Sequence, residues 1–226
     1  MMHPVSEGRI TLSSGTTNTP KKIWHSKDKL NLTSEVYKRT HDLDSSSRII
    51  NFMPLYHIGG LALHLAGEYV GAKVTNIDFN AYNFLDQLRD YSHTMLPDSS
   101  ITALRKTKSF DDYDFTGKFL HCGSEPHQKE NILSLVERGG TVFCNWGMTE
   151  IGPICVHTTF QPYDTESVEK YFAPGYLLGD NFEIEWKIDD DGELIVRSDM
   201  SIYRDWFYTG DIVKYENETL YYIRRR

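Results

Sequence analysis

The order of two sequence patterns constrains the fold of this chain more than any other feature. From residue 8 to about residue 145, short runs rich in β-forming residues alternate with stretches of helical periodicity. That alternation is typical of a mainly parallel sheet whose strands are joined by crossover helices. After about residue 160 the helical periodicity disappears and short β segments follow. We therefore predict an α/β core over residues 1–160, followed by a smaller β-rich subdomain over residues 161–226.

The predicted elements are short and regularly spaced. In the core, strands are predicted at Arg9–Ser13, Arg48–Phe52, Lys73–Ile77, His93–Leu96, Lys118–Cys122 and Thr141–Asn145. Helices are predicted at Lys27–His41, Gly60–Tyr69, Ala81–Tyr91 and His127–Arg138. In the tail, strands are predicted at Phe182–Ile188, Glu193–Arg197, Ile212–Tyr215 and Leu220–Ile223. Asp191 and Gly192 predict a hairpin between the first two of these, because glycine accepts the positive φ of a tight turn.

Composition and charge narrow the class of protein. A chain of 226 residues is long enough to bury a sizeable core. The formal charge of −8 disfavours nucleic-acid binding, which rewards a basic surface. The one dense basic run, Arg224 to Arg226, is a nucleic-acid tail or, as we expect, a solvated end or part of a motif. No apolar stretch reaches the roughly 20 residues of a membrane helix, so no membrane span is expected. The first residues lack the pattern of a secretory signal, and the cytoplasm is the expected compartment.

The sequence gives little support for a metal cluster or a disulfide scaffold. Cys122, Cys144 and Cys155 are few and lack the CxxC spacing, so we expect core thiols. His64 and Glu68 are placed to share a helical face, but no HExxH motif accompanies them. A zinc site is therefore not expected.

The first segment with chemical meaning follows the first predicted strand. Residues 12–21 read Leu-Ser-Ser-Gly-Thr-Thr-Asn-Thr-Pro-Lys, a loop of small hydroxyl residues that ends in a lysine. Exposed backbone N–H groups, hydroxyls and one lysine form a cradle for phosphate oxygens. An ordinary surface loop has the same composition, so this segment alone leaves both interpretations open. It does not match the GxxxxGK[ST] loop of P-loop NTPases.

The second segment, Asn145–Glu150, lies at the end of a predicted strand, where ligands collect in open α/β sheets. The carboxylate of Glu150 beside the hydroxyl of Thr149 suits Mg²⁺, which prefers a few hard oxygen ligands plus substrate phosphates. The start of a helix, with Thr149 as its cap, is the alternative.

The third segment is Trp206–Asp211 in the β-rich tail. An acidic side chain after a glycine turn can accept hydrogen bonds from both hydroxyls of a ribose. A Thr-Gly-Asp sequence by itself is more often a plain turn.

In this order, the three segments resemble the signature motifs of the adenylate-forming superfamily, which includes acyl-CoA synthetases, nonribosomal-peptide adenylation domains and luciferases. Ser14–Lys21 is similar to its phosphate loop, Trp146–Glu150 to its aromatic-Gly-x-Thr-Glu motif, and Tyr208–Asp211 to its Thr-Gly-Asp motif. Four further segments are also similar to family motifs. Pro54–Gly60 resembles the motif whose histidine borders the acid pocket in the family, and Gly123–Pro126 resembles the turn that lies along the adenine. Gly192–Leu194 resembles the strand before the ribose site, and Tyr222–Arg226 resembles the start of the hinge motif.

The resemblance implies ATP and Mg²⁺ as cofactors and a reaction in which a carboxylate attacks the α-phosphorus of ATP, giving an acyl-adenylate and pyrophosphate. It implies catalytic roles for Lys21, His57 and Thr149, and it implies Glu150 as the metal ligand. Asp211 is expected to bind the ribose. Trp146 stands where the family usually has tyrosine, which keeps a flat face for adenine but loses the phenolic oxygen. The implied nucleotide-binding residues are Ser14, Gly15, Thr16, Thr17, Lys21, Gly123, Ser124, Glu125, Pro126, Asn145, Trp146, Gly147, Thr149, Asp211 and Arg225.

The sequence also departs from the family pattern. Asn18 and Lys22 stand where the phosphate loop usually has glycines, although asparagine tolerates the left-handed conformation better than other residues with a side chain. Family members carry a region before the phosphate loop and a mobile C-terminal lid, and we find no match to either. An oligomer is an open possibility, because surface left by a missing lid would favour self-association.

Three functions from different classes stay open at this point. The chain is an adenylating core that works alone or with a separate lid chain, a module that holds ATP or AMP without turnover, or a degenerate fragment that acts through a protein partner. The implied partners are a carboxylic acid and, as acceptor, CoA or a carrier protein. Nothing in the sequence identifies the acid.

Overall fold

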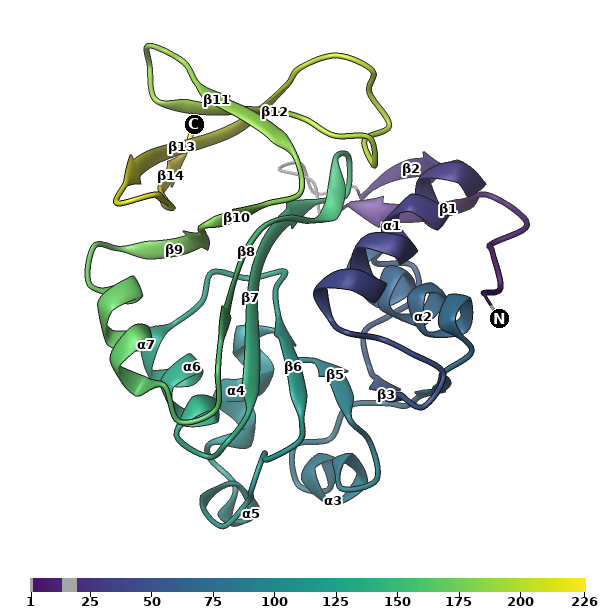
Figure 1. Ribbon diagram of the computed structural model, residues 1–226, viewed down its shortest axis with the longest axis vertical. Coiled ribbons are helices and arrows are strands. Elements are labelled where there is room, and N and C mark those ends of the chain that lie inside the picture. The colour runs from purple at the N-terminus through teal and green to yellow at the C-terminus, as the bar shows by residue number, and fades with distance from the viewer. Residues whose placement is uncertain (1, 14–19) are drawn as a thin grey trace.

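The computed structural model describes residues 2–13 and 20–226. Its centre is a seven-stranded sheet with the order β10-β8-β7-β6-β5-β3-β4 (Figure 1). The strands are β3 (Arg48–Asn51), β4 (Lys73–Asn76), β5 (His93–Met95), β6 (Phe119–Cys122), β7 (Thr141–Met148), β8 (Gly152–Phe160) and β10 (Asn181–Phe182). The pairs from β4 through to β7 are parallel, whereas β8 and β10 are antiparallel additions at one edge. The predicted mainly parallel sheet is confirmed.

Helices cover both faces of this sheet and give the molecule two main cores. On one face lie α1 (Lys27–Thr40) and α2 (Ile58–Val70). On the other lie α3 (Phe84–Leu88), α4 (Asp98–Leu104), α5 (Lys108–Asp111), α6 (Lys129–Val136) and α7 (Thr165–Phe172). Successive side chains of a strand point to opposite faces, so Ile49 packs in the first core and Ile50 in the second.

Local signals set the limits of the two longest helices. The Ser26 side chain accepts a hydrogen bond from the Lys29 amide and caps the start of α1. Gly71, at φ 77°, ends α2 in the left-handed conformation that glycine adopts without strain. Gly67 lets α2 lie close to the sheet, since a Cβ there would meet the side chains of Ile49 and Val74.

Two antiparallel sheets complete the fold. The five-stranded sheet has the order β11-β12-β13-β14-β9, with β9 (Tyr176–Gly179), β11 (Glu185–Ile188), β12 (Glu193–Arg197), β13 (Phe207–Glu216) and β14 (Thr219–Arg225). It lies above the large sheet in Figure 1 and packs on the β7–β8 hairpin through Ile151, Cys155 and Val156. The third sheet is the hairpin of β1 (Arg9–Ser13) and β2 (Lys21–His25).

Several predicted elements agree with the structure. The hairpin at Asp191 and Gly192 is present between β11 and β12, with Gly192 at φ 84°. The β-rich tail forms the separate antiparallel sheet. Residues 181–182 of that tail nevertheless pair with β8 in the large sheet, so we keep the division at residue 160 as a proposal.

Other predictions of element type and length are wrong. The helix predicted at Ala81–Tyr91 shrinks to α3, because Asn80 accepts a hydrogen bond from the Tyr82 amide and forms a turn in front of it. A helix, α7, interrupts the tail that was predicted to lack helical periodicity. Asp164 caps it, and Val168, Tyr171 and Phe172 form one short apolar stripe that packs on the core. At eight residues the helix is too short for that stripe to repeat. The strand predicted at Phe182–Ile188 is two strands, β10 and β11, in different sheets.

The strand predicted to end at Asn145 continues as β7 to Met148 and turns into β8. Thr149 lies in that turn, so the alternative of a helix start is wrong. The structure also contains β2, β8, β9, α4 and α5, which the sequence pattern did not predict. Among the helices of the described residues, none is long and apolar enough to cross a membrane.

Candidate functional site

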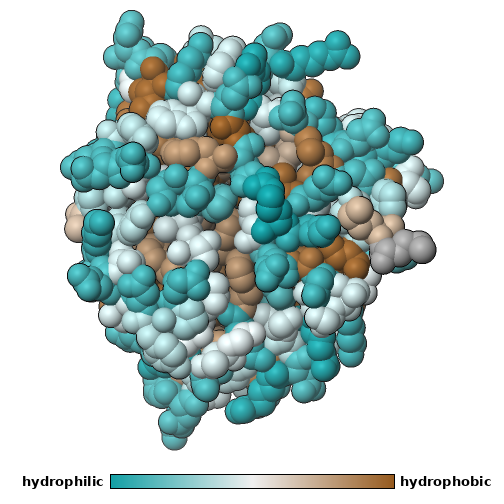
Figure 2. Space-filling model, in the orientation of Figure 1, coloured by the Kyte–Doolittle hydropathy of each residue, from teal (hydrophilic) through white to brown (hydrophobic). Residues whose placement is uncertain are grey.

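A cavity of about 480 Å³ opens where the carboxyl ends of β6 and β7 meet the five-stranded sheet. Ligands collect at this edge in open α/β sheets. The cavity brings together residues predicted from distant segments: Lys21, His57, Ser124, Glu125, Pro126, Asn145, Trp146, Gly147, Thr149, Glu150, Asp211 and Arg225. Hydrophilic residues cover most of the face drawn in Figure 2, and hydrophobic residues show mainly in its upper half and centre.

The hairpin β1–β2 brings Ser13 and Lys21 to one side of the cavity. Ser13 ends β1, and its buried Oγ has no hydrogen-bond partner among the described residues. Lys21 begins β2 directly opposite Ser13. The predicted residues Ser14, Gly15, Thr16 and Thr17 lie outside the described residues.

The turn between β7 and β8 presents Thr149 and Glu150. The Glu150 carbonyl accepts hydrogen bonds from the Ile202 amide (3.0 Å) and the Ser201 hydroxyl (3.3 Å), which tie the turn to the segment before β13. Gly147 is required for this geometry, because a Cβ there would lie 2.5 Å from the Pro153 carbonyl oxygen.

The Glu150 side chain lines the cavity and forms no hydrogen bond or ion pair with other described residues. Thr149, beside it, is buried. One carboxylate and one hydroxyl fit Mg²⁺, which usually takes one or two carboxylates together with phosphate oxygens and water. The donor set therefore suits an ion that arrives with a phosphate ligand.

The loop after β6 is fixed by Glu125. Its carboxylate accepts hydrogen bonds from the Ser99 amide (2.7 Å) and the Ser99 hydroxyl (2.9 Å) at the start of α4. Ser124, before it, has φ 71°, an unusual conformation for a residue with a side chain. Gly123 does not itself line the cavity, because it packs between the side chains of His121 and Asn145. The Asn145 amide group donates to the Pro153 carbonyl at 2.6 Å.

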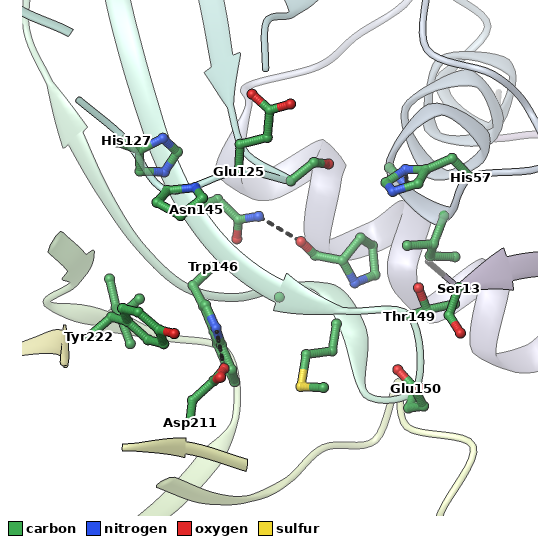
Figure 3. A pocket seen from close by; sticks show the side chains of 18 of the residues that line it. Ser13, His57, Glu125, His127, Asn145, Trp146, Thr149, Glu150, Asp211 and Tyr222 are labelled. Carbon is green, nitrogen blue, oxygen red and sulfur yellow. Dashed lines mark hydrogen bonds between the residues drawn. The ribbon is translucent and has the colours of Figure 1, made fainter. Parts of the chain in front are cut away.

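His57 borders the cavity at the start of α2 (Figure 3). It is the N-cap residue, and its Nδ1 accepts a hydrogen bond from the Gly59 amide at 3.2 Å. Partial burial lowers the pKa of its imidazole, so the neutral ring is favoured. Met95 closes this end of the cavity, since a Cβ on Gly59 would lie 2.8 Å from its Cε.

Asp211 lies on the opposite side of the cavity and is the most buried of its carboxylates, with 3% of its surface exposed. Its Oδ2 accepts a hydrogen bond from the indole N–H of Trp146 (3.2 Å), and its Oδ1 accepts one from Arg225 (3.1 Å). Burial raises the pKa of the Asp211 carboxyl, and Arg225 and the Trp146 N–H act in the opposite direction. In the structure Thr209–Asp211 lies within β13, where Gly210 has φ 76°.

Several cavity residues lie outside every predicted motif. They include Met95, His127, Pro153, Tyr176, Leu177 and Leu178. Tyr176 and Leu177 belong to β9, an element the analysis did not predict. His127 directly follows the predicted segment Gly123–Pro126, and that position was the one available signal for it.

The fold around this cavity is that of the amino-terminal domains of adenylate-forming enzymes. The chain belongs to the family described as AMP-binding enzyme, whose pattern matches residues 9–203. Among curated proteins it is similar to the 2-succinylbenzoate–CoA ligases of Bacillus mycoides (23% identity) and Bacillus cereus (24% identity), each over 77% of this chain. The chain spans 40% of the length of these relatives.

Solved structures support the fold assignment. The N-terminal domain of FACL13 from Mycobacterium tuberculosis has a TM-score of 0.81 at 18% identity, over 96% of this chain and 60% of that one. The amide bond synthetase McbA from Marinactinospora thermotolerans has a TM-score of 0.80 at 21% identity, over 96% and 48%. O-succinylbenzoate Coenzyme A Synthetase from Bacillus subtilis, in complex with AMP, has a TM-score of 0.79 at 19% identity, over 100% and 50%.

Proposed function

We propose that this chain is the nucleotide-binding core of an enzyme that activates a carboxylic acid with ATP. One observation carries the proposal. The phosphate-loop lysine, the Thr149–Glu150 turn, Trp146 and the pair Asp211–Arg225 come from distant segments and line a single cavity. Each of these groups suits a different part of an adenine nucleotide.

The roles proposed for the residues are those that the resemblance to the family motifs implies. Lys21, with Ser14 to Thr17, would hold the phosphates, and Thr149 would bond the α-phosphate. Ser124, Glu125 and Pro126, with Asn145, Trp146 and Gly147, would form the adenine wall, Gly123 would support that wall from behind, and Asp211 with Arg225 would meet the ribose. His57 would border the acid.

The proposed reaction forms a bond between a carboxylate oxygen and the α-phosphorus of ATP and breaks the bond to pyrophosphate. Both reactants are anions, so the residues must bring them together and offset their charge. Lys21 would offset charge on the phosphates. Mg²⁺, held by Glu150 and the phosphates, would supply further positive charge. A neutral His57 would let the acid approach without holding it as an ion pair.

The names of the curated relatives suggest acid:CoA ligation as the complete activity. Because the chain spans 40% of the length of these relatives, CoA or a carrier protein as acceptor, and a separate lid chain, belong to the proposal. The acid is likewise open, and 2-succinylbenzoate is a reasonable first candidate to test.

The first experiment is calorimetric titration of ATP with Mg²⁺ into the parent chain and two variants. We expect saturable binding that Asp211→Ala abolishes. Asp112→Ala is the matched control, because this exposed carboxylate lies outside the cavity, and we expect it to bind like the parent. Absence of binding to the parent would contradict the proposal. Pyrophosphate exchange with a panel of acids, with and without candidate lid proteins, then separates turnover from binding alone.

A further inference from the structure

The hydrogen bond between Trp146 and Asp211 joins two separate sheets. Trp146 lies on β7 of the large sheet, beside a register shift in its pairing with β8, and Asp211 lies on β13 of the five-stranded sheet. The indole N–H points across the cavity margin at Oδ2, as the dashed line in Figure 3 shows. Trp146 and Asp211 both line the cavity, so a ligand there would meet the indole ring and the carboxylate together.

The contacts of Asp211 fix the orientation of its carboxylate and leave hydrogen-bond acceptor positions available to a ligand. An ionised carboxylate has about four acceptor positions, two on each oxygen. Trp146 uses one on Oδ2, and Arg225 uses one on Oδ1. One position is left on each oxygen. Two acceptors held side by side match the two adjacent hydroxyls of a ribose.

We propose that Trp146 is a positioning residue, whose indole N–H holds Asp211 so that both carboxylate oxygens face the ribose diol. This inference rests on the proposed function, because it requires a nucleotide in the cavity. The side chain of Trp146 then makes two separate contributions to nucleotide binding. The flat ring faces the base, and the N–H acts on the ribose through Asp211.

The charged groups around Asp211 give the proposal a second readout. Arg225 and the Trp146 N–H favour the ionised carboxylate, whereas burial and the nearby Glu193 favour the protonated one. Removing the indole N–H therefore moves the pKa of Asp211 further upward. If the ionised form binds the diol, the loss of nucleotide binding on acidification begins at higher pH in a variant without this N–H.

The test compares AMP with 2′,3′-dideoxyadenosine monophosphate, which lacks both hydroxyls. Calorimetry gives the affinity of each nucleotide for the parent, for Trp146→Phe and for the control Trp186→Phe. Trp186 packs on Phe182 and Tyr215, away from the cavity. We expect Trp146→Phe to bind AMP about tenfold more weakly, equal to about 1.4 kcal/mol, and to bind the dideoxy nucleotide within twofold of the parent. The control should match the parent for both.

The outcomes separate this inference from the proposed function. An equal loss for both nucleotides, or an unshifted pH profile for AMP, would overturn the role of the N–H while leaving a working nucleotide site. A parent chain that binds neither nucleotide would overturn the proposed function and this inference together. Trp146→Leu gives a second, independent measurement should Trp146→Phe fail to fold, because leucine has no side-chain donor, and the ratio of the two nucleotide affinities reports the N–H even where loss of the ring weakens both.

Discussion

At the scale of single residues, Asp211 combines a proposed role in nucleotide binding with a cost to stability. Its carboxyl is almost wholly buried, and burial raises its pKa despite the contacts with Arg225 and Trp146. Between the ordinary carboxyl pKa and this raised value, the folded state holds more protons than the unfolded state. The stability contribution of Asp211 therefore decreases as pH rises through that interval. At neutral pH the ionised group favours unfolding, as is common for functional residues.

We predict that Asp211→Asn makes the ligand-free chain more stable at pH 7 while abolishing nucleotide binding. A gain of about 1 kcal/mol would raise Tm by roughly 2–4 °C in a chain of this size. Thermal unfolding at pH 7 and at pH 4 measures the effect, and the difference from the parent should shrink at the lower pH. A variant less stable than the parent at pH 7 would show that the contacts with Trp146 and Arg225 outweigh the burial.

At the scale of elements, the β7–β8 hairpin joins Trp146 to the Thr149–Glu150 turn. Its close backbone approach at Gly147 leaves no room for a side chain. We predict that Gly147→Ala costs more than about 2 kcal/mol of stability and weakens nucleotide binding, because the turn must shift away from Pro153. Urea unfolding and ATP titration provide the two measurements.

Gly117→Ala is the matched comparison for Gly147→Ala. Gly117 has φ 75° with no atom within 4 Å of an added Cβ, so alanine there brings only backbone strain, roughly 1–2 kcal/mol. We expect it to leave nucleotide affinity unchanged. Equal effects of the two substitutions on affinity would contradict the special role of the hairpin.

The elements that sequence could predict are those with a strong local signal. The parallel strands and α1 have continuous β-rich or helical patterns, and their bounds agree within a few residues. The failures have physical causes. The helix α7 has eight residues, too few for its apolar stripe of Val168, Tyr171 and Phe172 to repeat, and β10 consists of two residues that belong to the sheet only by pairing with β8. Partners distant in the sequence determine such elements, and local pattern does not show them.

The residues of the candidate site that could be predicted are those that belong to a sequence motif. Trp146, Glu150 and Asp211 all line one cavity, as the ordered motifs implied. Residues such as Met95 and Tyr176 reach it only through packing of separate elements, and no short motif identifies them. The side-chain contacts were equally hidden, because the bond from Trp146 to Asp211 depends on how two sheets pack.

At the scale of the whole molecule, the interior holds an unusual number of histidines that favour the neutral state. Seven of the nine histidines have a lowered pKa, in each case chiefly through burial: His25, His41, His57, His93, His121, His127 and His157. His41 and His121 lie at the centre, with His41 Nε2 and His121 Nδ1 2.9 Å apart. The pKa of His121 is lowered to about 3.

These histidines predict a loss of stability in mild acid. Their folded pKa lies below the unfolded value of about 6.5, so the stability they contribute is complete above pH 6.5 and falls as pH decreases toward the folded pKa. Each proton taken up on unfolding adds a slope of about 1.4 kcal/mol per pH unit. Urea unfolding between pH 7.5 and pH 5 measures the effect, because the carboxylates with lowered pKa, such as Glu183, titrate below this range and the raised pKa of Asp211 changes stability in the opposite direction.

His121→Asn tests the central pair, since asparagine keeps a polar atom near the position of Nδ1 but does not titrate. We expect this variant to be less stable at pH 7.5 and to lose stability less steeply on acidification, by about one proton. His64→Gln is the control, because His64 lies partly exposed beside Glu68, and we expect it to keep the parent slope. An unchanged slope in His121→Asn would mean that other groups govern the acid response. A parent chain equally stable at pH 7.5 and pH 5 would contradict the lowered pKa of the buried histidines.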